Sequence, residues 1–180
     1  MSKKVLIIST SLRTNSNSEM LADEFLRGAR DAGHEVEKIS LAGKTIQFCK
    51  GCLACLKVGR CVMGDDAVAI AEKMGRADVI CFATSVYYYG MSGQMKTMLD
   101  RANCLYDTDY AFRDIYLLTA STEAEDEASD GAVNGLNGWI ACFPKSRLAG
   151  VVRGGGASVP GDMKRCGDKL KAAYQMGLEL

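Results

Sequence analysis

Short apolar runs recur along the chain and alternate with segments whose apolar residues are spaced as on one face of a helix. Continuous hydrophobicity is typical of strands that are buried on both faces of a parallel sheet. The pattern predicts such strands at Val5–Ile8, Val79–Ala83, Ile115–Leu118 and Leu148–Val152, with a weaker, alternating strand at His34–Ile39.

The segments between the strands carry helical patterns, and the first is the best defined. Leu21, Phe25 and Ala29 lie on one of its faces, and Ser16 with Glu19 forms a capping box at its start. Further helices are predicted after Asp65–Asp66 as far as Gly75, from Ser92 to Ala102, and over Met163–Tyr174, with a weaker candidate at Glu127–Ile140. The weaker candidate contains Gly131, Gly135 and Gly138, which disfavour a helix.

The regular alternation of strands and helices predicts a doubly wound α/β fold. Apolar residues make up 48% of the 180 residues and charged residues 24%, which is an ordinary globular composition. Neither a repeat nor a proline-rich linker divides the chain. We therefore predict one domain over residues 1–180, with ligands bound beyond the carboxyl ends of the strands.

Charge and hydropathy narrow the classes of partner. The 22 lysines and arginines balance the 22 aspartates and glutamates, which disfavours a nucleic-acid or membrane-surface protein that binds through bulk charge. The longest apolar run near the N-terminus, Val5–Ile8, is too short for a membrane span or a signal-peptide core. We expect a cytoplasmic protein without nucleic-acid or membrane partners.

The segment after the first strand is rich in hydrogen-bond donors. Residues 9–18 contain four serines, two threonines, two asparagines and Arg13, and they lead into the first helix. A helix N-terminus has free backbone N–H groups and a partial positive charge, so it binds anions readily. The segment predicts a site for a phosphate monoester, and a simple turn with a helix cap is the alternative.

Three consecutive tyrosines, Tyr87–Tyr89, follow the third predicted strand. Three adjacent aromatic side chains at the mouth of a sheet cannot all enter the core, so a planar aromatic ligand could stack on them. Gly90 and Gly93 allow the backbone to approach a ligand closely. A subunit interface, where tyrosine is also enriched, is the alternative.

Four of the eight cysteines fall within a short loop, residues 48–62, after the second predicted strand. Four thiolates at this spacing could ligate a [4Fe–4S] cluster, because each of the four irons takes one cysteine. Zinc, free thiols and a redox disulfide stay open as alternatives. The candidate ligands are Cys49, Cys52, Cys55 and Cys61.

The order of a phosphate loop, a cysteine-rich segment and the motif Ser85–Lys96 followed by Asp100–Arg101 resembles the flavodoxin-fold NAD(P)H-dependent FMN reductases, and among them the iron–sulfur flavoproteins. The resemblance implies a three-layer fold with a five-stranded parallel sheet in the order 2-1-3-4-5. It also implies a homodimer or homotetramer. The chain departs from many relatives in having Ser85 where they have proline, and Thr10–Arg13 where they have Gly-Ser-Pro-Arg.

The same resemblance implies a non-covalently bound FMN. Its phosphate would be surrounded by Ser9, Ser11, Arg13, Asn15, Asn17 and Ser18. Its ring system would lie along Ser85, Val86, Tyr87, Tyr88, Tyr89 and Gly90, with Ser121 and Thr122 near the pyrimidine edge. The four clustered cysteines match the compact motif of the iron–sulfur flavoproteins.

The function that follows from the resemblance is an oxidoreductase. It would take hydride from NAD(P)H onto FMN and pass electrons to an unidentified acceptor, such as flavin or a quinone. No side chain is predicted to be catalytic, because hydride transfer to flavin requires no side-chain acid or base. The alternatives are an electron carrier that relays single electrons between protein partners, and a binding module stapled by zinc.

Overall fold

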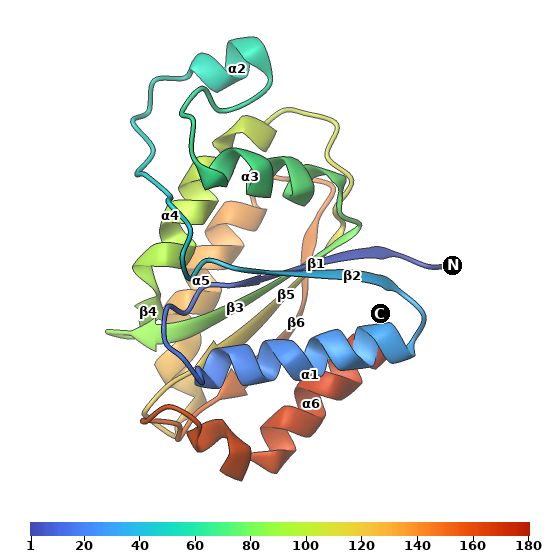
Figure 1. Ribbon diagram of the computed structural model, residues 1–180, viewed down its shortest axis with the longest axis vertical. Helices are drawn as coiled ribbons and strands as arrows, with labels where there is room; N and C mark the ends of the chain where they lie inside the picture. The colour runs from blue at the N-terminus through green and yellow to red at the C-terminus, as the bar shows by residue number, and fades with distance from the viewer.

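A parallel β-sheet forms the centre of the molecule, which a computed structural model describes over residues 1–180 (Figure 1). Its strands run in the order β2-β1-β3-β5-β6, which confirms the predicted flavodoxin-like order. Their bounds are β1 Lys4–Ser9, β2 Glu35–Ser40, β3 Val79–Tyr87, β5 Asp114–Ala120 and β6 Arg147–Gly154. A two-residue strand, β4 Gly90–Met91, pairs antiparallel with the end of β3 and was absent from the prediction.

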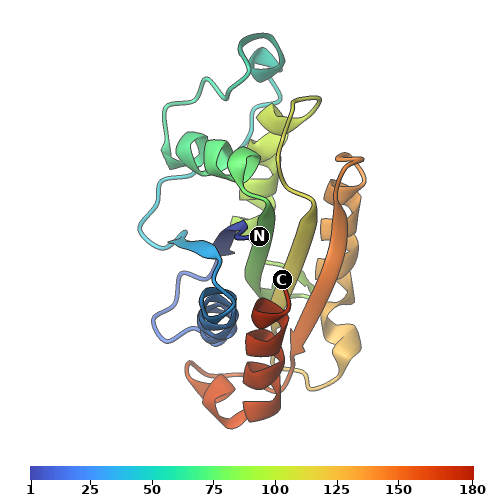
Figure 2. The same ribbon diagram turned by 90° about the vertical axis from the view of Figure 1, so that its right-hand side faces the viewer.

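Helices cover both faces of the sheet, as a doubly wound fold requires (Figure 2). One face is covered by α1 Asn17–Asp31 and α6 Gly167–Leu178, which lie side by side, and the other by α3 Asp66–Arg76, α4 Gly93–Arg101 and α5 Asp130–Ile140. Short 3₁₀ helices occupy Ala102–Leu105 (η1), Asp126–Ser129 (η2) and Asp162–Arg165 (η3). The helix α2, Ala54–Val58, stands away from the sheet at one end of the molecule (Figure 1).

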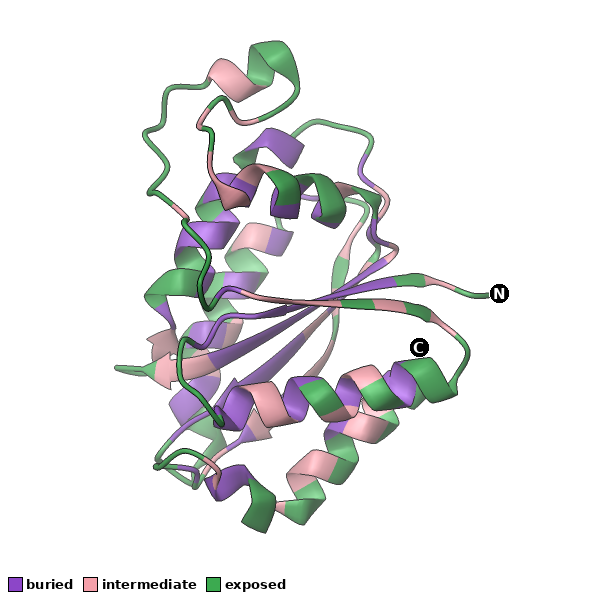
Figure 3. Ribbon diagram, viewed as in Figure 1, coloured by how far each residue is buried: buried purple, intermediate pink, exposed green.

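The central strands β1, β3 and β5 are mostly buried (Figure 3), whereas β2 has no buried residue. Successive residues of a strand point to opposite faces of the sheet. In β1, Leu6 and Ile8 pack into the core beneath α3, α4 and α5, whereas Val5 and Ile7 pack into the core beneath α1 and α6. This two-sided burial explains why the central strands appear in the sequence as continuous apolar runs, and the exposure of β2 explains its alternating pattern.

Two local features differ from the sequence prediction. Strand β3 continues beyond Ala83 through the expected loop as far as Tyr87. The last helix begins at Gly167 rather than near Met163, because Gly161 adopts a left-handed conformation and the next four residues form η3. The weaker helix candidate is confirmed as η2 and α5 in spite of its glycines, for a packing reason given below. No helix is both long and apolar enough to cross a membrane.

Candidate functional site

A cavity of about 380 Å³ opens at the carboxyl ends of the parallel strands. Four loops line it, and each follows a different strand: β1, β3, β5 and β6. The chain leaves β1 toward β2 on one side, while β3 pairs with β1 on the other, so this edge holds the topological switch point. The lining residues are Arg13, Ser16, Asn17, Ser85, Val86, Tyr87, Tyr88, Tyr89, Ala120, Thr122, Glu123, Ala157, Ser158 and Pro160.

The loop after β1 brings hydrogen-bond donors to the cavity. Ser16 caps helix α1, and Arg13 is exposed at the cavity wall. Asn15 adopts a left-handed backbone conformation, with φ of 54°, and this tightens the turn into the helix. The first backbone N–H groups of α1 have no partner within the helix, so this end of the cavity suits an anion.

Two predicted members of this loop lie beneath it rather than on the cavity. Ser9 and Ser18 are fully buried, and Ser18 Oγ lies 3.1 Å from Ser16 Oγ. Ser9 Oγ is buried without any hydrogen-bond partner. An unpaired buried hydroxyl carries a desolvation cost. Ser11 Oγ accepts a hydrogen bond from the backbone of Arg13 at 3.3 Å and shapes the turn.

Asn17 lines the cavity, but its side chain is engaged in hydrogen bonds to the backbone of the loop after β6. Its amide nitrogen donates to the carbonyls of Ala157 and Val159, at 3.2 and 2.9 Å. Its amide oxygen accepts from the backbone of Met163 at 3.1 Å. The side chain therefore ties the loop after β6 to the start of α1, and only the backbone of Asn17 is free to meet a ligand.

Buried hydroxyls join the loop after β1 to the loop after β3. Thr10 Oγ1 donates to the carbonyl of Ala83 at 3.0 Å and lies 3.0 Å from Ser92 Oγ. Thr84 Oγ1 donates to the same Ser92 oxygen at 3.1 Å, and Ser92 in turn caps α4. This network fixes the spacing between the anion-binding end of the cavity and its tyrosine wall.

The tyrosines form a tight hairpin between β3 and β4. Tyr87 pairs with Gly90, so Tyr88 and Tyr89 are the two turn residues, with φ of 48° and 61°. Such turns favour Asn-Gly, and a bulky residue at positive φ is strained. All three tyrosine side chains are exposed. A strained backbone turn that holds exposed aromatic rings at a cavity indicates a binding role for the turn.

Helix α5 supports this hairpin through its glycines. A Cβ placed on Gly131 would lie 2.2 Å from the carbonyl oxygen of Tyr89, and one on Gly135 would lie 2.7 Å from the end of Met91. Gly138 has nothing within 4 Å of the same position. Two of the glycines that weaken the helical pattern are therefore the residues that let the hairpin rest on the helix.

The remaining wall comes from the loops after β5 and β6, which are bonded to one another. The carbonyl of Ser121 accepts from the backbone of Ala157 at 2.9 Å, and the carbonyl of Glu123 accepts from Gly156 at 3.0 Å. Asp162 accepts from the backbone of Ser158 and Val159, and these hydrogen bonds lower the pKa of its carboxyl group.

The structure thus brings most of the predicted cofactor residues to one cavity. Eight of them line it: Arg13, Asn17, Ser85, Val86, Tyr87, Tyr88, Tyr89 and Thr122. Six others lie beside or beneath it: Ser9, Ser11, Asn15, Ser18, Gly90 and Ser121. The lining residues Ala157, Ser158 and Pro160 were not predicted, since only the preceding glycine run marks their loop. The donor-rich loop and the tyrosine wall fit the phosphate and the ring system of FMN.

The four clustered cysteines line a second cavity, between the loop 48–62 and the α4–η1 segment. Cys49 and Cys52 are exposed, whereas Cys55 and Cys61 are half-buried. Cys104, from η1, lines the same cavity, and burial raises the pKa of its thiol. The thiols suit an iron–sulfur cluster in number and chemistry, but no three metal-ligating side chains in the structure lie close enough to hold a metal ion. Their role as ligands stays a prediction.

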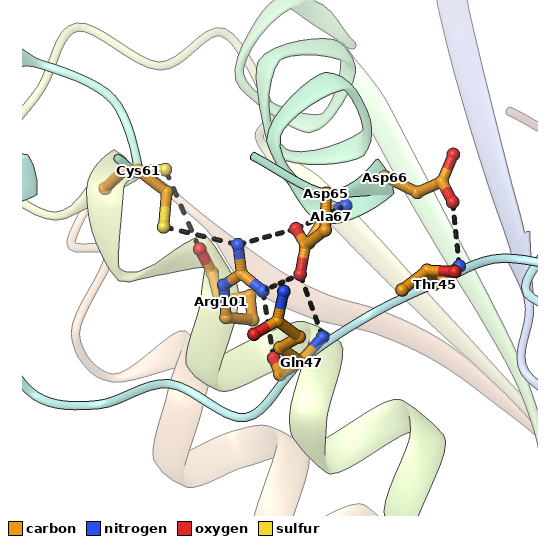
Figure 4. A network of polar contacts seen from close by, with 8 residues as sticks. Thr45, Gln47, Cys61, Asp65, Asp66, Ala67 and Arg101 are labelled. Atoms are coloured by element: carbon orange, nitrogen blue, oxygen red, sulfur yellow. Dashed lines mark hydrogen bonds and ion pairs between the residues drawn. The ribbon is translucent and has the colours of Figure 1, made fainter. Parts of the chain in front are cut away.

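A buried ion pair lies beside this cavity (Figure 4). Arg101, at the end of α4, donates to both carboxylate oxygens of Asp65, at 2.5 and 2.7 Å. This pairing lowers the pKa of Asp65 and raises that of Arg101. The same guanidinium donates to Cys61 Sγ at 3.3 Å, and Asn103 Nδ2 lies 3.6 Å from Cys55 Sγ.

Comparison with known proteins places the chain in a family. The sequence profile of the NADPH-dependent FMN reductases matches residues 3–143. The chain belongs to this family. An iron–sulfur flavoprotein of Methanocaldococcus jannaschii is 40% identical over 102 residues, which are 57% of this chain and 53% of that protein. Another, from Methanosarcina thermophila, is 33% identical over 61% of this chain and 58% of that protein.

The chain therefore spans about half the length of the curated relatives that it matches. Matches to solved structures cover nearly the whole of this chain. An NAD(P)H:quinone oxidoreductase from Methanothermobacter marburgensis matches with a TM-score of 0.79 over 99% of this chain and 96% of its own, at 18% identity. An azoreductase from Bacillus anthracis matches over the whole of both chains, with a TM-score of 0.73 and 18% identity. At this identity the likeness establishes the fold, and it agrees with that of the FMN reductase family.

Proposed function

We propose that residues 1–180 form one FMN-binding domain of an oxidoreductase that takes hydride from NAD(P)H and passes electrons to a second acceptor. The observation that carries the proposal is the cavity at the carboxyl ends of β1, β3, β5 and β6, with an anion-binding loop at one end and tyrosines along its wall. Family membership supports the same cofactor. Acceptors of this class include free flavin, quinones, nitro compounds and redox proteins.

The loop after β1 would hold the phosphate. Arg13 would supply a positive charge, and the N–H groups at the start of α1 would supply directed hydrogen bonds. Ser11 and Asn15 shape the turn, and Ser9 and Ser18 are buried beneath it. Arg13 and the start of α1 would thus bind and orient the ligand.

The hairpin and the loop after β5 would hold the ring system. Tyr87, Tyr88 and Tyr89 offer aromatic faces, and Ser121 and Thr122 lie in the loop that reaches the opposite wall. When bound there, FMN would supply the redox chemistry, which is transfer of hydride from a nicotinamide and of electrons to an acceptor. The protein's own task is to position the ring and exclude water from one of its faces, so we assign no catalytic side chain.

A visible spectrum and an NAD(P)H reduction experiment test this function. Protein purified without air should be yellow and should be bleached rapidly by NADH or NADPH, with turnover when menadione or FMN is added. A colourless protein that does not bind added FMN would refute the proposal. Arg13→Ala combined with Ser11→Ala should weaken FMN binding, while Lys171→Ala, on the exposed side of α6, serves as a matched control.

The cysteine cavity supports a second candidate, an electron carrier. Here Cys49, Cys52, Cys55 and Cys61 would ligate a [4Fe–4S] cluster, and electrons would pass singly between the protein and redox partners. The names of the relatives, iron–sulfur flavoproteins, agree with this candidate. Slow reduction by nicotinamides together with fast reduction by a ferredoxin would favour the carrier over the reductase.

A further inference from the structure

A buried ion pair holds the loop that carries the four cysteines against the rest of the protein. Both side chains of the pair are almost completely buried, with exposures of 0% for Arg101 and 1% for Asp65. Asp65 also caps helix α3, through the backbone of Ala67. The pair therefore joins the end of α4 to the start of α3, and Figure 4 shows it between the two ends of the loop.

The ion pair binds one end of the loop at Gln47, two residues before the first cysteine. Its carbonyl oxygen accepts from Arg101 Nη1 at 2.9 Å, and its backbone N–H donates to Asp65 Oδ2 at 2.8 Å. The other end is held by Cys61, the last cysteine, whose sulfur accepts from Arg101 Nη2 at 3.3 Å. Arg101 thus contacts both ends of the cysteine loop and its own counter-ion at the same time (Figure 4).

The four cysteines are held unequally. Cys55 and Cys61 are half-buried, and each faces a donor from the α4–η1 segment, Asn103 or Arg101. Cys49 and Cys52 are exposed, in a stretch without regular secondary structure. Two of the four thiols are therefore fixed by donors from the α4–η1 segment, and the other two are in contact with solvent.

We infer that Arg101, oriented by Asp65, is the positioning residue of the cysteine loop and that its bond to Cys61 raises the reduction potential of an iron–sulfur cluster held there. The second part rests on the proposed ligand role of the four cysteines. Hydrogen bonds to ligating sulfurs stabilise the more negative, reduced state of a cluster. Lysine would preserve the charge, but it lacks the planar guanidinium group, so it cannot donate hydrogen bonds to Asp65, Gln47 and Cys61 at the same time.

Two variants of the full chain separate these effects. Arg101→Lys preserves the charge of the pair, which protects folding because Asp65 is not left without a counter-ion. Arg60→Gln, at an exposed position in the same loop, is the control for a change in loop charge. Each protein is studied iron-free by hydrogen–deuterium exchange, and after anaerobic reconstitution by iron analysis and an EPR-monitored redox titration.

In Arg101→Lys, backbone exchange at Gln47, whose N–H donates to Asp65, and in helix α2 should become at least tenfold faster in the iron-free protein. Iron retention should fall, and the midpoint potential should become more negative. Arg60→Gln should match the wild type in exchange and iron content. Unchanged exchange in Arg101→Lys would overturn the positioning role, and an unchanged potential would overturn the tuning role. If the wild type takes up no iron, the ligand assignment and the tuning role fall together, while the exchange result still decides the positioning role.

Discussion

The glycines of α5 give a sharp test of how the tyrosine hairpin is held. Gly131→Ala would place a Cβ 2.2 Å from the carbonyl oxygen of Tyr89, about 1 Å closer than such atoms normally approach. Gly138→Ala, on the same helix, would meet nothing within 4 Å. The two variants make the same chemical change in the same helix and differ in what the new methyl group touches.

The expected energies have opposite signs. Alanine stabilises a helix by about 0.5–1 kcal/mol relative to glycine, so Gly138→Ala should raise the free energy of unfolding by that amount. In Gly131→Ala the same gain is opposed by overpacking, which typically costs about 1–3 kcal/mol. The oxygen that the methyl group would meet belongs to the backbone, so relief of the clash requires the hairpin to move. We expect a net loss of about 1 kcal/mol in stability.

Urea unfolding, followed by circular dichroism, measures the two stabilities. Quenching of flavin fluorescence measures the Kd for FMN, which depends on the position of the tyrosine turn. A shift of this turn should raise the Kd of Gly131→Ala for FMN about tenfold. Gly138→Ala should bind FMN like the wild type. Equal stabilisation of both variants would show that the hairpin does not rest on Gly131, and the reasoning would fail.

Three further outcomes are expected. Ser9→Ala removes an unpaired hydroxyl that is buried beneath the loop after β1, so the free energy of unfolding in urea should change by less than about 0.5 kcal/mol and FMN affinity measured by fluorescence should stay within about twofold; a tenfold loss of affinity would show that the hydroxyl contacts the ligand. The pKa of Asp162 is lowered in the folded protein, so its ionised carboxylate stabilises the fold above about pH 4, and this stabilisation is lost as pH falls through the lowered value. When the free energy of unfolding is measured at decreasing pH, it should fall less steeply in Asp162→Asn than in the wild type, and equal slopes would contradict this role. Arg153, in β6, donates to Ser129 and Asp130, at 3.1 and 2.7 Å, and so fixes the start of α5, on which the tyrosine hairpin rests. Arg153→Gln should therefore weaken FMN binding several-fold, with little loss of stability in urea unfolding; unchanged FMN binding would contradict this role.

Much of the fold was predictable because burial on both faces leaves a direct trace in the sequence. The runs at Val5–Ile8 and Val79–Ala83 are apolar at every position, since alternate residues enter different cores. The capping box at Ser16 likewise marks the start of α1 by a local hydrogen bond. Such patterns depend only on residues that are close in the chain, so they can be recognised from the sequence alone.

The candidate site was predictable in outline for the same reason. Parallel strands bring their carboxyl ends to one edge, so the loops after β1 and β3 had to meet there. Which side chains face the cavity was a separate matter. Ser9 and Ser18 carry the expected chemistry but lie under the loop, and the amide of Asn17 is used to hold the loop after β6.

Other features were decided only by tertiary packing. The glycines of α5 weaken a helix when considered alone, and their use emerges only where the helix meets the hairpin. Cys104 is distant in sequence from the cysteine loop, yet it lines the same cavity. Arg101 and Asp65 meet across two helices. Periodicity and capping are local and can be recognised in the chain, whereas close approach, burial of charge and the direction of a side chain depend on segments that only the folded structure brings together.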